Sequence, residues 1–543
     1  LPPFRFLSNV PLNNCRIDTL LRSFSSVDSS NKTVTYIPKS EDFATYIKPE
    51  LNTHILLFDE DQNKNYIDFL SILDLIKNWN TRNESNKVFT KTVWEHYRIY
   101  IRLDETKYTA LVDTAIKHMD GTTIPVSIID DNKLAAQYLL SRFPLFYPIR
   151  SLSKESLTSN DVIINLNIIS ESDNELTNWI IREAYWLGTF FYTGVTLSIN
   201  IISPKKDAIL SRLEYTCPRL FLPIPDSDKV SKVSWGDQDS LEQLESGRLF
   251  DNLNAIRKTR NGYSYYIINC DSDISSLNLA IKIREWEIQN TVRSKTAIKS
   301  SNFPVITYHC ENLDICHMAE SLVVHQEEYG DNWYNNYSII PFNASHHYQF
   351  SELDGGHFEK MSQSVHLQYC GCDTNAPKEK KEQFLEDYFT RCYNRDSSMA
   401  VALSIPYRLF QMSTSTNDHI LPIGWVLKNT EAYSNNTSLK AMANQATKIT
   451  ETNKQEMLYY ERARWMRYMI SRGWQPASAD ETIKFMKAGN PRRQLYIGLL
   501  HGCICSQTDL KELQEKLYAQ YEYTANPDER FAGNSPRRDT KTK

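Results

Sequence analysis

Glycine is the residue that this sequence most clearly lacks. Only 16 of the 543 residues are glycine, about 3% against a usual share of roughly 7%. The order Gly-x-Gly does not occur in the chain. Loops that bind phosphate through their backbone need glycine for the close approach, so the shortage weighs against a phosphate loop of the usual kind.

An excess of either charge is also missing. The chain has 61 Lys and Arg against 66 Asp and Glu, a net charge of -5. Nucleic-acid-binding proteins usually carry a basic face or tail, so we expect no nucleic-acid partner. The 10 cysteines are scattered along the whole length. This spacing favours free thiols in a reducing compartment over a disulfide framework.

A long apolar run is absent as well. Residues Ala184 to Pro204 carry no charge, but they include threonines, an asparagine and two glycines. This stretch predicts a helix end followed by a strand, not a membrane span. The chain begins at Leu1, and we expect membrane helices or another effector upstream of it. The chain itself is then expected on the cytoplasmic side of a membrane.

Short β-rich runs alternate with helical patterns in the first part of the chain. Strands are predicted at 4–10, 33–38, 54–60, 98–103 and 124–130, with helices at 65–79 and 108–119. The pattern restarts with strands at 162–170, 195–203, 263–271 and 303–311 and helices at 174–188 and 277–289. Strands joined through helices predict parallel sheets, so residues 1–150 and 151–345 are expected to form two Rossmann-like α/β units.

The rest of the chain has a different pattern. Beyond residue 345 we expect helices and no strands, at 350–372, 379–411, 439–472 and 508–521. Residues 346–520 are therefore predicted to be a mainly helical domain. The polar tail, 521–543, is expected to be disordered.

Both turns that should carry a dinucleotide-binding motif lack it. The turns that follow the strands at 4–10 and 162–170 contain no glycine, and the second offers Glu171 and Asp173. Their carboxylates would repel a pyrophosphate, so NAD binding in the usual manner is not expected. No cofactor is firmly indicated.

One stretch resembles a known regulatory family. "HILLFDEDQNKN" (54–65) is similar to the segment after the second strand of TrkA-N units, the Rossmann-type regulators of potassium channels. "RIYIRLDE" (98–105) and "IPVSIIDDNKLAAQYLLSRFP" (124–144), with Ala135 and Ala136 opening a helix, resemble its continuation. The resemblance implies the architecture and names no ligand.

The segment "YERARWMRYMISRGW" (460–474) has two tryptophans and a glycine. Helical spacing puts Glu461 and Trp465 on one face, and Gly473 is expected to end the helix. In one interpretation the tryptophans fill a core while Arg462, Arg464 and Arg467 face water. In the other, a flat indole beside guanidiniums and a carboxylate suits a purine nucleotide.

The same segment resembles the ryanodine-receptor (RyR) domain, which reads Glu-x-x-x-Trp followed by Gly-Trp. "FEKMSQSVHLQYC" (358–370) and "RDSSMAVAL" (395–403) resemble an earlier copy of the repeat. The resemblance implies a nucleotide or nucleotide-derived ligand, with Trp465 stacked on the base and arginines at phosphate or ribose. The expected ligand-binding residues are Trp465, Glu461, Arg464, Trp474, His366, Tyr369 and Arg395.

Three other motifs are candidates for metal-binding or catalytic sites, and each indicates such a site only weakly. "HLQYCGC" (366–372) and "HGCIC" (501–505) bring His near Cys, but their Cys-x-Cys spacing favours buried thiols over a zinc site. The carboxylates of "DEDQN" (59–63) could bind a hard cation, but the segment lacks the spacing of a calcium loop. A solvated strand end is the favoured interpretation. We find no Ser/His/Asp arrangement and expect no catalytic or metal-binding residues.

These features together predict a regulatory, ligand-sensing protein. We expect a homo-oligomer that takes a small anionic nucleotide as second messenger and gates an ion-channel-like bacterial effector. Antiviral defence is an analogy at family level. The alternatives are a nicotinamide-dependent oxidoreductase, a nucleotide hydrolase, or a scaffold without a ligand.

Overall fold

The computed structural model describes most of the chain, in ranges with gaps between them. Contacts group the chain into two compact units. The described residues of unit 1 lie within Leu1–Leu134 and Ala344–Leu403, and those of unit 2 lie within Ala135–Asn343 and Ser404–Ala525. The described residues are 5–10, 33–37, 43, 53–82, 97–117, 119, 124–150, 152–237, 241–244, 247–257, 262–293, 304–312, 314–316, 339–343, 357–372, 376–389, 392–413, 454–487, 494–495, 499–506, 508–513 and 515.

Unit 1 contains a parallel sheet with the strand order β2-β1-β3-β4-β5. Its strands are β1 (Arg5–Ser8), β2 (Thr33–Tyr36), β3 (Thr53–Leu57), β4 (Tyr97–Arg102) and β5 (Val126–Ile129). The helices that follow β3 and β4 are α3 (Gln62–Arg82) and α4 (Glu105–Lys117). Helix α5 (Asp131–Arg142) follows β5, and its residues from Ala135 on belong to unit 2. From the C-terminal part, the unit includes α14 (His357–Tyr369), α15 (Lys378–Phe389) and the beginning of α16 (Cys392–Ser413).

Unit 2 contains a second parallel sheet, ordered β11-β10-β9-β6-β7-β8. Its strands are β6 (Val162–Ser170), β7 (Val195–Ile202), β8 (Lys232–Trp235), β9 (Gly262–Asn269), β10 (Val305–His309) and β11 (Ile339–Phe342). The chain moves outward from β6 to β8 and then returns to the other side of β6, as in doubly wound folds. The prediction of two α/β units with parallel sheets is thereby confirmed.

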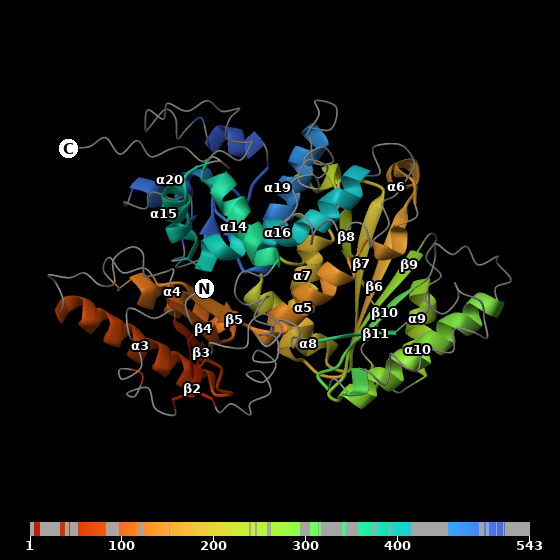
Figure 1. Ribbon diagram of the computed structural model, residues 1–543. Helices are drawn as coiled ribbons and strands as arrows, with labels where there is room; N and C mark the ends of the chain where they lie inside the picture. The colour runs from red at the N-terminus through yellow and green to blue at the C-terminus, as the bar shows by residue number, and fades with distance from the viewer. Residues whose placement is uncertain are drawn as a thin grey trace. The chain divides into compact units, whose positions relative to one another are not determined.

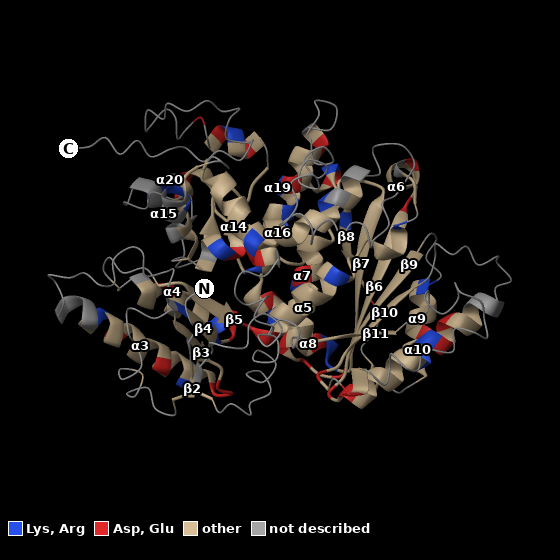
Figure 2. Cartoon of the chain, in the orientation of Figure 1, with Lys and Arg blue, Asp and Glu red and all other residues tan. Residues whose placement is uncertain are grey.

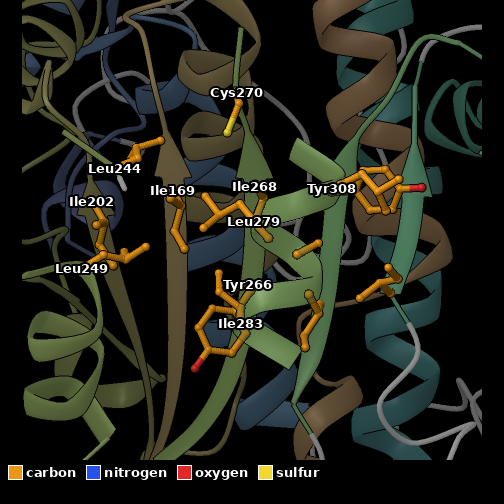
Figure 3. Close-up of a cluster of buried hydrophobic side chains, with 14 of the residues drawn as sticks. Ile169, Ile202, Leu244, Leu249, Tyr266, Ile268, Cys270, Leu279, Ile283 and Tyr308 are labelled. Atoms are coloured by element: carbon orange, nitrogen blue, oxygen red, sulfur yellow. The ribbon is translucent and has the colours of Figure 1, made fainter. Parts of the chain in front are cut away.

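Helices cover both faces of this second sheet (Figure 1). One side carries α7 (Glu175–Leu187) and α8 (Lys206–Thr216), and the other carries α9 (Arg248–Arg257) and α10 (Asp273–Arg293). The central strands are coloured as uncharged residues (Figure 2), which suits burial on both faces. Ile169, Ile268 and Ile283 belong to the apolar cluster that α10 forms with the sheet (Figure 3). Shorter elements are η3 (Tyr147–Ile149), α6 (Lys154–Ser159) and η4 (Ser227–Lys229).

The C-terminal part of unit 2 is not purely helical. Besides α19 (Lys454–Ser471) and α20 (Ala479–Lys487), it has a small sheet ordered β12-β14-β13. The strands are β12 (Gln475–Pro476), β13 (Gln494–Leu495) and β14 (Leu500–His501). The prediction that strands end at residue 345 is therefore wrong. Strands of two residues have no periodicity to detect and exist only through their pairing.

The uncharged stretch from Ala184 to Pro204 divides as predicted. It contains the end of α7, at Leu187, and all of β7. In the part of the chain that the structure describes, no helix combines the length and apolar character needed to cross a membrane. The described cysteines are free thiols. The expected helical segment 439–453 and the tail 521–543 lie outside the described residues.

Candidate ligand-binding site

Helix α19 ends at a glycine with a left-handed backbone. Gly473 has a φ of +84°, and its N–H donates to the carbonyl of Ile470 at 2.9 Å. The N–H of Trp474 donates to the carbonyl of Met469 at 3.0 Å. These bonds satisfy the last carbonyls of the helix, which confirms the predicted cap. They also turn the chain back, so that Trp474 leads into β12.

The two tryptophans meet at a histidine. Pairing of β12 with β14 places Pro476 opposite His501. The ring centroid of His501 lies 5.0 Å from that of Trp465 and 5.9 Å from that of Trp474, both nearly perpendicular. His501 Nδ1 accepts the N–H of Cys503 at 3.0 Å, which fixes the ring. Trp474 is buried, whereas Trp465 keeps part of its surface in solvent.

A carboxylate one turn before Trp465 holds two guanidiniums. Glu461 accepts hydrogen bonds from Arg464 at 2.7 and 3.0 Å and also from Arg408 on α16. Burial acts to raise the pKa of Glu461, but the two guanidiniums outweigh it and hold the pKa at about 2. The carboxylate is therefore charged at neutral pH, and the cluster has two positive charges for one negative charge.

The arginines of α19 point inward. Arg464 and Arg467 are each only 2% exposed. Arg464 also lies over the ring of Trp186 at 5.7 Å, and Arg467 donates to Thr189 Oγ1 at 3.0 Å and to the Ser231 carbonyl at 2.7 Å. Burial lowers the pKa of Arg467 to about 10, so it stays charged. The interpretation that placed these arginines in water is wrong for Arg464 and Arg467, because α19 packs on α7 along this face.

The remaining predicted site residues belong to unit 1. His366 on α14 is buried, with Nε2 3.2 Å from the carbonyl oxygen of Phe384, whereas Tyr369 is 56% exposed. Arg395 on α16 donates to Glu359 and to the Val126 carbonyl, both at 3.3 Å. Burial acts to lower the pKa of Arg395, and Glu359 reverses this and raises it.

The predicted residues thus fall into two sets. Trp465, Glu461, Arg464 and Trp474 lie in unit 2, and His366, Tyr369 and Arg395 lie in unit 1. Sequence reasoning missed His501 as the residue that joins the tryptophans and Arg408 as the second partner of Glu461. Neither residue has a local signal, because each reaches the cluster from a distant part of the chain.

Side chains occupy the crevice where a Rossmann unit binds its ligand, at the carboxyl ends of β6 and β9. Asn174 caps α7 by accepting the N–H of Thr177 at 2.9 Å, and it also accepts from Asn269 Nδ2 at 2.9 Å. Glu171 accepts the N–H of Asp271 at 3.0 Å. The N–H of Thr177 in the first turn of α7 is thus already bonded, and acidic residues gather in the loops at this end of the sheet (Figure 2).

Unit 1 has a corresponding arrangement between β1 and β3. Asn9 accepts the N–H of Phe58 at 2.9 Å and donates to Asn65 Oδ1 at 2.9 Å and Asp68 Oδ2 at 3.0 Å. In both sheets, a side-chain network fills the position at which the strand order reverses. In both sheets, the polar side chains at this position therefore form hydrogen bonds within the protein.

A buried lysine joins carboxylates in unit 1. Lys133 Nζ lies 2.5 Å from Glu105 Oε2 and 2.7 Å from Asp396 Oδ1. Burial raises the pKa of Glu105 to about 7, Asp396 adds to this, and Lys133 opposes it. Burial likewise raises the pKa of Asp130 to about 6. The buried ammonium group of Lys133 is therefore shared between the carboxylates of Glu105 and Asp396.

Within the described residues, no three His, Cys, Asp or Glu side chains are placed to hold a metal ion together. Comparison with family models, with curated proteins and with solved structures gives no match for this chain.

Proposed function

We propose that the chain is a regulatory protein that binds a small anionic aromatic molecule of nucleotide type at Trp465. The observation that carries the proposal is the partly exposed indole of Trp465, braced at 5.0 Å by His501. A fixed, partly exposed indole offers a stacking surface at little entropic cost, because its orientation is already set.

The charges beside Trp465 support an anionic ligand. Arg408 and Arg464 share the single carboxylate of Glu461, so the cluster has an excess of positive charge. Because Arg464 is buried and bonded, an incoming phosphate reaches it by replacing Glu461. Arg408 lies on α16 and Arg464 on α19, so the exchange alters the ion pair between these helices. Such a change provides the two states that a ligand sensor needs.

The wider role is proposed on the resemblance stated above. In this proposal the chain forms a homo-oligomer and regulates a channel-like membrane effector, and the nucleotide is a second messenger in antiviral defence. The rival function is an enzyme, a nicotinamide-dependent oxidoreductase or a nucleotide hydrolase. The carboxylate of Glu171 and the capped N–H of Thr177 at the β6–β9 crevice favour the sensor over the first of these.

A thermal-shift panel of ATP, ADP-ribose, NAD and cyclic oligonucleotides tests the proposal. We expect one class to stabilise the protein without being consumed. Trp465→Ala should weaken its binding about 5- to 150-fold, since stacking on an aromatic side chain contributes roughly 1–3 kcal/mol. Tyr215→Ala is the matched control, because Tyr215 is an aromatic residue of unit 2 that is 88% exposed. Equal binding by the Trp465 variant contradicts the proposal, turnover of the ligand indicates the enzyme, and no stabilisation indicates a scaffold.

A further inference from the structure

Helix α7 carries a buried arginine that has no carboxylate partner among the residues that the structure describes. Every residue of the helix from Leu176 to Leu187 is buried, and Arg182 is 5% exposed. The structure gives Arg182 neither a hydrogen bond nor an ion pair with any described residue, and its Nε is a buried donor without an acceptor. Its one defined contact is the ring of Trp179, whose centroid lies 5.1 Å from the guanidinium. Leaving a buried charge in this state is costly unless an anion balances it.

A second guanidinium lies against the same tryptophan. Arg472, which follows α19, is 4.9 Å from the centroid of the Trp179 ring and donates to Glu183 Oε1 at 2.6 Å. Glu183 is fully buried and also accepts the indole N–H of Trp186 at 3.0 Å. The group around Trp179 therefore includes two guanidiniums and one carboxylate, and no described carboxylate supplies the negative charge that would balance Arg182.

The acidic residues at the start of α7 do not supply this charge. Asp173 and Glu175 are engaged by Arg212 at 2.9 and 2.6 Å. Asp173 also accepts a hydrogen bond from Asn178 Nδ2 at 3.2 Å. Asn178 lies four residues before Arg182 and so shares its side of the helix. Its buried Oδ1 accepts no hydrogen bond from any described residue. Asn178 therefore adds an unsatisfied acceptor on the side of the helix where Arg182 has an unsatisfied donor.

We propose that Arg182 and Arg472 bind a small oxyanion, a phosphate or the phosphoryl group of a larger molecule, beside Trp179. A guanidinium presents paired N–H groups that match two oxygens of a phosphate. The Oδ1 of Asn178 suits the hydroxyl of a singly protonated phosphate, because it accepts and does not donate. The site involves other residues than the stacking surface at Trp465, and neither depends on the other.

The test uses inorganic phosphate and the intact chain. Thermal unfolding is followed against phosphate and against chloride at equal ionic strength, and binding is measured by titration calorimetry. We expect phosphate to raise the melting temperature of the native protein. Arg182→Met, which keeps the length of the side chain and removes the charge, should abolish this response. Arg182→Lys should fold and bind about tenfold more weakly, because it loses the paired geometry.

Arg248→Met is the matched control, because Arg248 also belongs to unit 2 and its side chain is 70% exposed. It should respond to phosphate like the native protein. The proposal is overturned if the native protein shows no phosphate response, or if Arg182→Met keeps the full response. If Arg182→Met does not fold, an unchanged affinity of Arg182→Lys overturns it.

Discussion

Glu183 and Arg472 form an ion pair of 2.6 Å that joins α7 to the end of α19, and the carboxylate of Glu183 is fully covered. Both groups were removed from water when the helices packed. A buried pair of this kind adds little net stability over apolar residues, but removing one partner leaves the other buried and uncompensated.

Glu183→Gln should therefore lower the free energy of unfolding by about 3–5 kcal/mol, measured by urea unfolding at pH 7. The double variant Glu183→Gln with Arg472→Met should lose less than the sum of the two single losses, because it leaves no unpaired charge. Glu242→Gln is the control, since that side chain is 87% exposed. A loss below 1 kcal/mol for Glu183→Gln would show that Arg472 has a second sufficient partner.

The carboxylates around Lys133 should give unit 1 a pH-dependent stability. Burial raises the pKa of Glu105 from 4.5 to about 7, so the folded state holds this proton more tightly than the unfolded chain does. Stability from this group is therefore complete below pH 4.5 and is lost as pH rises towards 7. The shift corresponds to roughly 3 kcal/mol at most.

Glu105→Gln should flatten the dependence of unfolding free energy on pH between 4.5 and 7, in urea titrations at closely spaced pH values. The groups that face Glu105 are Lys133, Asp396 and Asp130, and Asp130 should leave a smaller slope towards pH 6. Glu60→Gln is the matched control, because Glu60 also belongs to unit 1 and its side chain is exposed. An unchanged slope in Glu105→Gln would assign the titration to another group.

The cap of α19 should tolerate no side chain at position 473. Gly473 has a φ of +84°, and a Cβ there would lie 2.7 Å from the carbonyl oxygen of Thr216. Gly473→Ala should cost about 1–3 kcal/mol from backbone strain, with the clash added to it. Gly247→Ala is the matched control, because a Cβ at Gly247 meets nothing within 4 Å. Thermal and urea unfolding compare the two, and an equal effect of both substitutions would contradict the assigned strain.

The crevice of the second sheet should depend on the side chain of Asn174. This residue accepts from the N–H of Thr177 and from Asn269 Nδ2, both at 2.9 Å. Asn174→Ala leaves the N–H of Thr177 without this acceptor and removes one of the two acceptors of Asn269 Nδ2, the other being Thr177 Oγ1. The loss should be about 0.5–2 kcal/mol. Asn174→Asp keeps the acceptor and should retain most of the stability. If the Asp variant loses as much as the Ala variant, the hydrogen bonds are not what Asn174 contributes.

The strands of the two sheets could be predicted from the sequence where burial makes most of their residues apolar. The run 162–170 is mostly apolar, and it forms the buried central strand β6. Strand β8 was missed, because Lys232 to Trp235 alternates exposed and partly buried residues at the edge of the sheet. Edge strands of four residues resemble loops in sequence, since half of their side chains face water.

The candidate site could be predicted from the sequence only in part. The helix, its glycine cap and the position of Trp465 follow from local spacing along 460–474. The inward direction of Arg464 and Arg467 does not, because arginine is usually exposed. It depends on Trp186, Thr189 and Ser231, which approach from elsewhere in unit 2.

The sequence by itself determined the α/β character, the restart of the strand pattern near residue 162, and the lack of a glycine-rich phosphate loop. These features are local, since they follow from periodicity and from which residues permit a given backbone. Only the tertiary structure decided which charges are paired: Glu461 with Arg408, Glu183 with Arg472, and Arg182 with no carboxylate among the described residues. The strength of an ion pair depends on distance and burial, and residues far apart in the chain acquire both only when the helices pack.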